Sequence, residues 1–146
     1  QPPPPLPHPP SQDRDQERWG THWLAGFIDG DGSFQIKLIH KKNRNQTEVR
    51  LQLQIELSLE LVYMLNEIKK HFGGNHYTRS QKNGLQSVYY NSTSFTVFRI
   101  FIQYLDKFCL CSNKYKEYVI WRRAYFYRTN IPKITKMKET LTRLKR

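Results

Sequence analysis

The chain contains two pairs of segments in which apolar and polar residues alternate. A period of two predicts half-buried β-strands, and the short polar turns between the paired segments predict two hairpins. The alternation is strictest in 47–58, where five apolar residues alternate with Glu, Arg and Gln. The four predicted strands cover 33–42, 47–58, about 76–80 and about 85–91.

Apolar residues elsewhere recur every three or four positions, which predicts amphipathic helices. One such helix begins the folded part, and its apolar residues are Trp23, Leu24, Phe27 and Ile28. The others are predicted over 61–72, from a Ser92 or Ser94 cap to Phe108, over 112–127 and over 133–145. The order of elements, a helix and a hairpin repeated and then further helices, predicts an α+β fold.

Proline marks the expected domain organisation. Seven of the eight prolines lie in 1–10, so a Pro-rich and then charged tail without a core is predicted for 1–18. One domain is expected over 19–131, followed by a basic amphipathic helix over 132–146.

The charge points to a polyanionic partner. The formal net charge is +12, and residues 114–146 hold eleven Lys or Arg against two glutamates. Such an excess favours nucleic acid. No apolar run reaches transmembrane length, so no membrane role is expected. Cys109 and Cys111 lack the spacing of a structural zinc site, and both are interpreted as reduced, structural thiols of an intracellular protein.

The segment 24–32 combines small residues with two carboxylates. Gly26 and Gly30 lie four positions apart, a spacing that lets a second backbone approach closely. The Asp-Gly-Asp-Gly end is expected to stop the helix through a left-handed glycine cap. A carboxylate at a helix C-terminus faces the negative end of the dipole. A bound divalent cation would offset that cost, so Asp29 and Asp31 are placed for function.

The sequence Leu-Ala-Gly-Phe-Ile-Asp-Gly-Asp-Gly of 24–32 resembles the signature of the LAGLIDADG homing endonucleases, with Phe27 and Gly30 as the departures. The resemblance implies the αββαββα fold, a curved four-stranded antiparallel sheet with helices on one face. It implies a site-specific endonuclease that cuts double-stranded DNA, promotes intron mobility and often occurs in organelles such as mitochondria or chloroplasts.

The resemblance also implies residue roles. Asp31 and the Gly30 carbonyl would bind Mg²⁺ (or Mn²⁺). Asp29 is expected to be structural or to support the metal ligands from behind, with direct metal binding as the less favoured alternative. A single motif implies a homodimer on a pseudo-palindromic site. Its expected interface residues are Leu24, Gly26, Phe27 and Gly30.

Two accessory positions are less clear. The family places a polar, water-positioning residue at the end of the second strand, where this chain offers Glu56 or Leu57, of which only Glu56 could do that chemistry. A late lysine is expected to stabilise the transition state. Lys114 is the first choice for it, with Lys116 as the alternative, and Ser112 could occupy the matching place.

The polar face of the strands is a candidate DNA-reading surface, because Arg and Lys pair with guanine edges and Gln pairs with adenine. In the second hairpin, Thr78, Arg79 and Ser80 lie on different faces of the strand, and the sequence does not decide which face meets DNA. The candidate contacts are Gln35, Lys37, Lys41, Arg44, Glu48, Arg50, Gln52, Gln54, Thr78, Arg79, Ser80 and Lys116.

Three alternatives remain at this stage. The same fold serves maturases that bind group I intron RNA. A degenerate member could instead be recruited into a ribonucleoprotein such as a ribosome, with rRNA as its partner. The chain could also be one half of a longer two-motif protein.

Overall fold

The computed structural model describes residues 22–43, 45–80, 82, 84 and 86–146. The predicted tail over 1–18 and the candidate contact Arg44 lie outside the described residues. The elements are α2 (Trp23–Asp31), β1 (Gly32–Lys41), β2 (Gln46–Ser58), the short 3₁₀ helix η1 (Leu59–Leu61), α3 (Val62–Phe72), β3 (Asn75–Ser80), β4 (Gln86–Ser92), α4 (Phe95–Lys107), α5 (Lys114–Phe126) and α6 (Ile131–Leu144).

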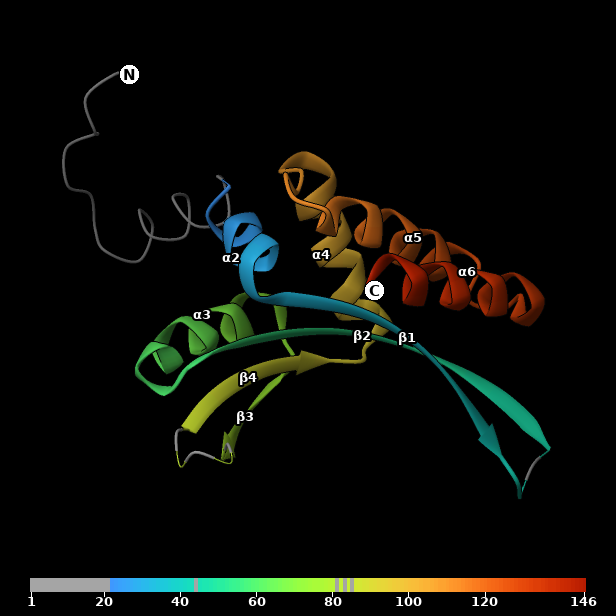
Figure 1. Cartoon of the computed structure of the whole chain (residues 1–146), viewed down its shortest axis with the longest axis horizontal. Helices are drawn as coiled ribbons and strands as arrows, with labels where there is room; N and C mark the ends of the chain where they lie inside the picture. Colours follow the sequence, from blue (N-terminus) through green and yellow to red (C-terminus); the bar gives the residue numbers. More distant parts are fainter. Residues whose placement is uncertain (1–21, 44, 81, 83, 85) are drawn as a thin grey trace.

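The strands form one antiparallel sheet with the order β1-β2-β4-β3. Figure 1 shows that the sheet is arched and that the helices lie on one side of it, so its opposite, concave side stays uncovered. The α+β fold expected from the sequence is therefore confirmed, and each predicted strand agrees with the structure to within about two residues. No helix in the described part of the chain is long and apolar enough to cross a membrane.

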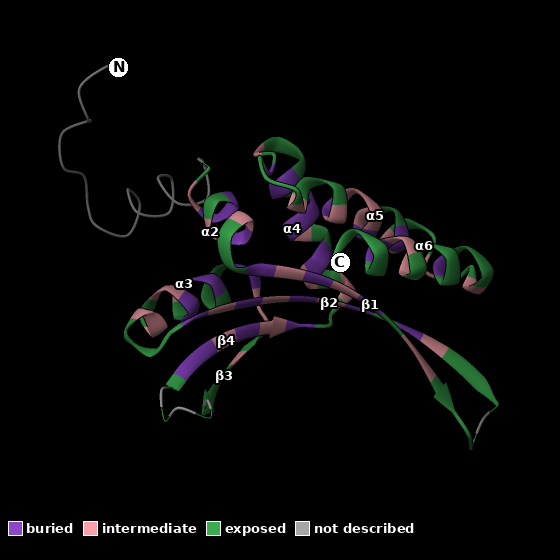
Figure 2. Ribbon diagram, viewed as in Figure 1, coloured by how far each residue is buried: buried purple, intermediate pink, exposed green. Residues whose placement is uncertain are grey.

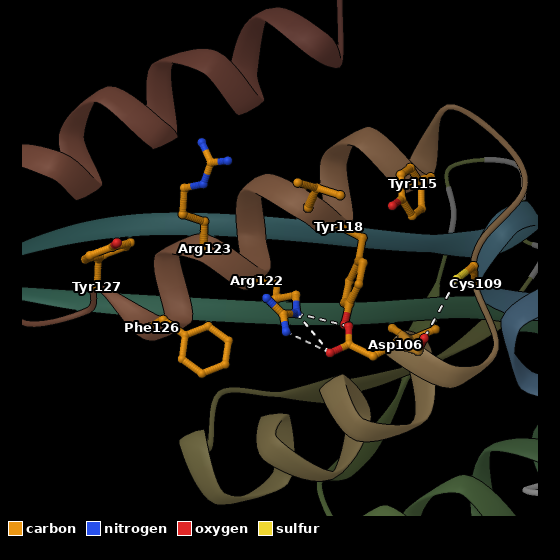
Figure 3. Close-up of a pocket in the computed structure, with 10 residues that line it drawn as sticks. Asp106, Cys109, Tyr115, Tyr118, Arg122, Arg123, Phe126 and Tyr127 are labelled. Atoms are coloured by element: carbon orange, nitrogen blue, oxygen red, sulfur yellow. Dashed lines mark hydrogen bonds and ion pairs between the residues drawn. The ribbon is translucent and has the colours of Figure 1, made fainter.

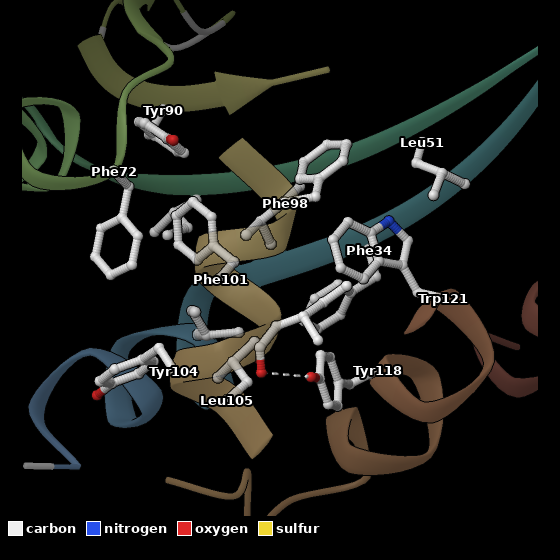
Figure 4. Close-up of a cluster of buried hydrophobic side chains, with 14 of the residues drawn as sticks. Phe34, Leu51, Phe72, Tyr90, Phe98, Phe101, Tyr104, Leu105, Tyr118 and Trp121 are labelled. Atoms are coloured by element: carbon white, nitrogen blue, oxygen red, sulfur yellow. Dashed lines mark hydrogen bonds between the residues drawn. The ribbon is translucent and has the colours of Figure 1, made fainter. Parts of the chain in front are cut away.

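The core lies between the sheet and the helices (Figure 2), and aromatic side chains fill its centre (Figure 4). Trp121 of α5 is fully buried; its ring centroid lies 5.1 Å from that of Phe34 and 4.7 Å from that of Phe98. Phe72 stacks on Phe101 at 4.2 Å. Aromatic pairs at these separations contribute about 0.5–1.5 kcal/mol each beyond the area they bury. They fix α4 and α5 against the sheet.

The motif helix α2 is held at its first turn by a buried tyrosine. The backbone N–H groups of Leu24 and Ala25 both donate to the Tyr104 hydroxyl of α4, each at 3.1 Å. The first N–H groups of a helix lack partners within that helix. Tyr104 therefore satisfies two of them and orients α2 against α4.

The end of α2 differs from the expectation. Gly32 does not adopt the left-handed cap conformation, because its φ of −84° and ψ of 157° belong to an extended residue that begins β1. The need for glycine is steric: a Cβ at this position would lie 2.8 Å from both the side chain and the carbonyl oxygen of Ile28. The helix passes directly into the strand, and this close passage places Asp31 at the junction.

Candidate nucleic-acid interface and cleavage site

One face of α2 is left open by the other residues that the structure describes. Gly26 and Gly30 are exposed, and a Cβ added at either position would meet no atom within 4 Å. Phe27 is half-buried beside them. Leu24 was expected at this interface, and that expectation is wrong: its side chain is 0% exposed within the chain's own core. Leu24 lies on the opposite side of α2, where it packs instead of meeting a partner.

Asp31 is exposed at the C-terminal end of α2 and opens onto a surface depression of about 830 Å³. Glu56 of β2 lines the same depression, so the structure brings together these two predicted catalytic carboxylates. Glu60 of η1 lines it as well, a residue that the alternation of β2 could not reveal because it lies beyond the strand. The depression is therefore acidic on several sides.

The structure decides between the two residues considered at the end of β2. Leu57 is 7% exposed and belongs to the core, whereas Glu56 points to the polar side of the sheet. The Glu56 carboxylate accepts a hydrogen bond from the Ser87 hydroxyl at 2.7 Å and forms an ion pair with Arg79 at 3.5 Å. These contacts hold Glu56 in place, and its oxygens can still accept further hydrogen bonds.

Asp29 has a structural role, as the sequence suggested. Its carboxylate accepts hydrogen bonds from the backbone N–H groups of Cys111 and Ser112 and from the Ser112 hydroxyl, at 2.7–3.1 Å. Partial burial alone would raise the pKa of Asp29, but these hydrogen bonds and the nearby Lys114 charge lower it overall. Asp29 thus ties the end of the motif helix to the loop that precedes α5.

Asp29→Asn is expected to lower the free energy of unfolding by about 1–3 kcal/mol at neutral pH, because charge-assisted hydrogen bonds are lost. The folded-state pKa lies below the unfolded value of about 3.9. The stabilisation is therefore present above about pH 4 and is lost as the pH falls through the folded pKa. Urea unfolding of both proteins at a series of pH values measures the effect. A difference that grows on acidification would contradict this role.

Lys114, the first-choice lysine, is the first residue of α5 and is half-buried. Its backbone N–H donates to the Ser112 hydroxyl at 3.1 Å, which in turn donates to Asp29. Lys116 is exposed two residues further along the same helix. The loop therefore links Lys114, rather than Lys116, to the end of α2. Cys109 and Cys111 are free, as expected, but both are exposed and neither packs in the core.

The strand registers define a shared polar face on the concave side of the sheet. Gln35 pairs with Gln52, Lys37 with Arg50, and Ser33 with Gln54. On its other side, Gln54 pairs with Asn91 of β4. On the second hairpin the face continues through Tyr89 and Ser87 of β4 and through Asn75, Tyr77 and Arg79 of β3.

The register therefore answers the question left open for the second hairpin. Arg79 shares the polar face, whereas Thr78 pairs with buried Val88 and lies on the side of the helices, as does Ser80. The face also holds five residues that the sequence did not predict: Ser33, Asn75, Tyr77, Tyr89 and Asn91. Ser33 shares its strand face with Gln35, and Asn75 and Tyr77 share theirs with Arg79, so a period of two relates them, but β4 held no predicted contact from which Tyr89 and Asn91 could be placed.

Contacts within the polar face preorganise several of its side chains. Glu48 forms ion pairs with Lys41 at 3.3 Å and Arg50 at 3.5 Å, so this acid orients two cations instead of acting alone. The Gln52 amide donates to the Asn91 side chain across the sheet. The Arg79 guanidinium lies 4.5 Å from the Tyr89 ring centroid. Such partial networks limit the conformational entropy lost when a ligand binds.

A second pocket, of about 520 Å³, lies between the end of α4 and α5 (Figure 3). Its polar centre is already paired: the Asp106 carboxylate accepts from the Tyr118 hydroxyl at 2.7 Å and from Arg122 at 2.8–3.1 Å. The pocket contains none of the predicted site residues. We interpret it as a structural cluster that joins α4 to α5.

The donor set at the end of α2 suits a hard divalent cation. Asp31 offers a carboxylate and Gly30 a backbone carbonyl, the oxygen ligands that Mg²⁺ prefers. The described residues contain no group of three or more His, Cys, Asp or Glu side chains arranged to hold a metal.

Comparisons with known proteins agree with this geometry. An uncharacterised 37.2 kDa protein of cox1 intron 2 from Schizosaccharomyces pombe is 46% identical over 106 residues, which are 72% of this chain and 30% of that protein. The intron-encoded DNA endonuclease aI3 of Saccharomyces cerevisiae is 27% identical over 125 residues, 69% of this chain and 30% of that protein. The chain thus spans about a third of the length of these curated relatives.

Among solved structures, the archaeal intron-encoded homing endonuclease I-Vdi141I, complexed with DNA, superposes with a TM-score of 0.72. It shares 20% identity, with 88% of this chain and 85% of that chain covered, so this likeness shows the fold. The family described as LAGLIDADG endonuclease matches residues 24–125, which include the motif, the sheet and most of α5. The chain belongs to the LAGLIDADG endonuclease family.

Proposed function

We propose that this chain is a site-specific, Mg²⁺-dependent endonuclease that cuts both strands of a DNA duplex as a two-fold symmetric dimer. The observation that carries the proposal is the position of Asp31. It lies at the exposed end of the motif helix, beside the open face of Gly26 and Gly30 and at the margin of the polar side of the sheet.

Asp31 and the Gly30 carbonyl would hold the metal ion. When bound, Mg²⁺ would activate a water and neutralise charge at the phosphate being cut. Glu56, fixed by Ser87 and Arg79, orients a water molecule in the same depression. Lys114 supplies a positive charge on the other side of the end of α2. Its helix begins there because Ser112 hydrogen-bonds both Asp29 and the Lys114 backbone.

Dimerisation supplies the second active site. One Asp31 can act on one strand, and a C2 axis through the small-residue face of α2 would place two copies beside each other. Such an axis also makes two concave sheet faces continuous, which suits a pseudo-palindromic target. In a longer two-motif protein a second, similar domain would occupy the same face.

The polar face is the proposed DNA-binding surface. Two-stranded ribbons fit the major groove, and Gln, Arg and Lys can read base edges there. The complex with DNA named for I-Vdi141I supports a DNA partner. The cox1 intron in the name of the fission-yeast relative favours an organellar intron as the origin of this chain.

The function can be tested with intron-free cox1 DNA from the organism that encodes this chain. We expect a double-strand break at one position in the presence of Mg²⁺ and none when EDTA removes the metal. If the target lies outside cox1, a library of randomised duplexes can be incubated with the protein and sequenced for cut ends. Absence of cutting in both assays by folded protein would overturn the endonuclease proposal, and tight binding to group I intron RNA would then favour the maturase alternative.

A further inference from the structure

Helix α6 brings a cation to the start of β1 from the far end of the sequence. Its C-terminal end points back to the centre of the molecule, close to β1 (Figure 1). There the Lys145 ammonium donates to the Ser33 hydroxyl at 3.1 Å. Ser33 lies two residues after Asp31 and on the polar face of the sheet. Lys145 therefore reaches the same corner of the molecule as the proposed metal ligands.

Lys145 lies among several charged side chains. Its ammonium lies 3.8 Å from the Glu117 carboxylate, and that glutamate side chain is only 12% exposed. Partial burial lowers the pKa of Lys145, the attraction of Glu117 opposes this effect, and repulsion from Lys114 adds to it. Lys145 and Lys114 therefore repel each other, while Glu117 lies close to Lys145 and the Lys114 charge acts on Asp29. A bound phosphate would relieve this repulsion.

The surroundings extend this positive charge along β1. A groove between α6 and β1 is lined by Lys145, Lys138 and Lys37, together with the amide of Gln35. The Gln35 amide also approaches the Ser33 hydroxyl at 3.5 Å. Ammonium, hydroxyl and amide groups are donors that bind the oxygens of a phosphodiester backbone.

We propose that Lys145 and the Ser33 hydroxyl form a binding site for the backbone phosphate next to the metal-binding end of α2. The ligand class is a nucleic-acid phosphodiester, and the inference rests on the proposed function in taking that phosphate to belong to the DNA being cut. Lys145 acts as a positioning residue: it sets the register of the backbone at Asp31. Helix α6 is thereby part of the active surface and not only a cover for the core.

A purely structural role for Lys145 makes a different prediction. A cation at the C-terminal end of a helix is favoured by the helix dipole, and the contacts with Ser33 and Glu117 could simply fasten α6 to the sheet. In that case Lys145→Met would change stability but not the salt dependence of DNA binding. A phosphate contact changes the salt dependence, because each one releases a condensed counterion.

The experiment compares Lys145→Met with Lys136→Met on the intron-free cox1 duplex, without divalent ions so that the DNA stays intact. Lys136 lies nine residues earlier, so a 100° rotation per residue places it on the opposite side of α6. We expect Lys145→Met to reduce the slope of log K against log salt by about 0.9 for each bound chain. We expect Lys136→Met to leave the slope unchanged and Lys145→Arg to restore it.

Equal slopes for Lys145→Met and Lys136→Met would overturn the phosphate site. The same result would leave the endonuclease proposal intact if the wild-type protein still cuts the duplex with Mg²⁺ and Asp31→Asn does not. Conversely, a reduced slope for Lys145→Met in a protein that binds but never cuts would support the phosphate site and overturn the proposed enzyme. Urea unfolding of each variant verifies that it is folded under the binding conditions.

Discussion

Asp31→Asn is expected to lower the rate of DNA cleavage by on the order of 10³-fold, the scale seen when an active site loses a principal electrostatic group. The amide keeps the shape of the side chain but removes the negative charge that would hold the metal. Asp31 is exposed at the end of its helix, so folding should be nearly unaffected. The measurement is the single-turnover cleavage rate with saturating protein and Mg²⁺, together with the affinity for the uncut duplex.

Asp29→Asn is the matched control for this change. It makes the same substitution two residues earlier on the same helix, in a carboxylate that is engaged by N–H and hydroxyl donors. We expect this variant to lose stability and, because the loop at Lys114 is loosened, some of its cleavage rate, but far less than Asp31→Asn under conditions where it is folded. Cutting by Asp31→Asn at the wild-type rate would rule out Asp31 as the essential metal ligand. Equal losses in both variants would point to a structural cause.

Gly26→Leu is expected to convert the dimer into a monomer. A Cβ at this position meets no atom of the described residues within 4 Å, and leucine stabilises an exposed helix by about 0.5–1 kcal/mol relative to glycine. At a close helix–helix contact the same side chain would separate the backbones. The expected result is therefore a folded protein, at least as stable as the wild type, that no longer associates or cuts both strands.

Sedimentation velocity over a range of concentrations measures this change. Gln103→Leu, at an exposed position of α4, is the control for added surface hydrophobicity, and it should leave the association unchanged. A dimer that persists in Gly26→Leu would place the contact between chains elsewhere on the surface. A wild-type chain that stays monomeric on its DNA target would contradict the proposed homodimer and favour a second domain as the partner.

The sequence predicts most elements of the fold because their signals are local. The alternation in β2 depends on neighbouring residues alone, and the structure confirms that strand over Gln46–Ser58. The site is harder to predict, because its parts come from distant segments. The Lys145–Ser33 contact spans 112 positions, and no local pattern in either segment predicts it.

The direction of individual side chains is also difficult to predict from the sequence. Leu24 and Gly26 belong to one motif, yet one is buried and the other is open, because two positions on a helix differ by about 200°. Thr78 and Arg79 separate in the same way on a strand, where neighbours point to opposite faces. Which face of a helix or strand is buried depends on the element that packs against it, and only the tertiary structure shows that element.

The position of α6 along β1 is expected to protect the protein from aggregation. Strand β1 ends the sheet on one side, and a strand ten residues long with an unpaired edge would be a template for pairing with other chains. Helix α6 packs against this strand, and Leu38, Thr135 and Thr142 line a groove between them. At the other side β3 has six residues, most of them exposed and polar, which discourages such pairing. Shortened variants that lack α6 should therefore be less soluble than the full chain, even where the motif is intact.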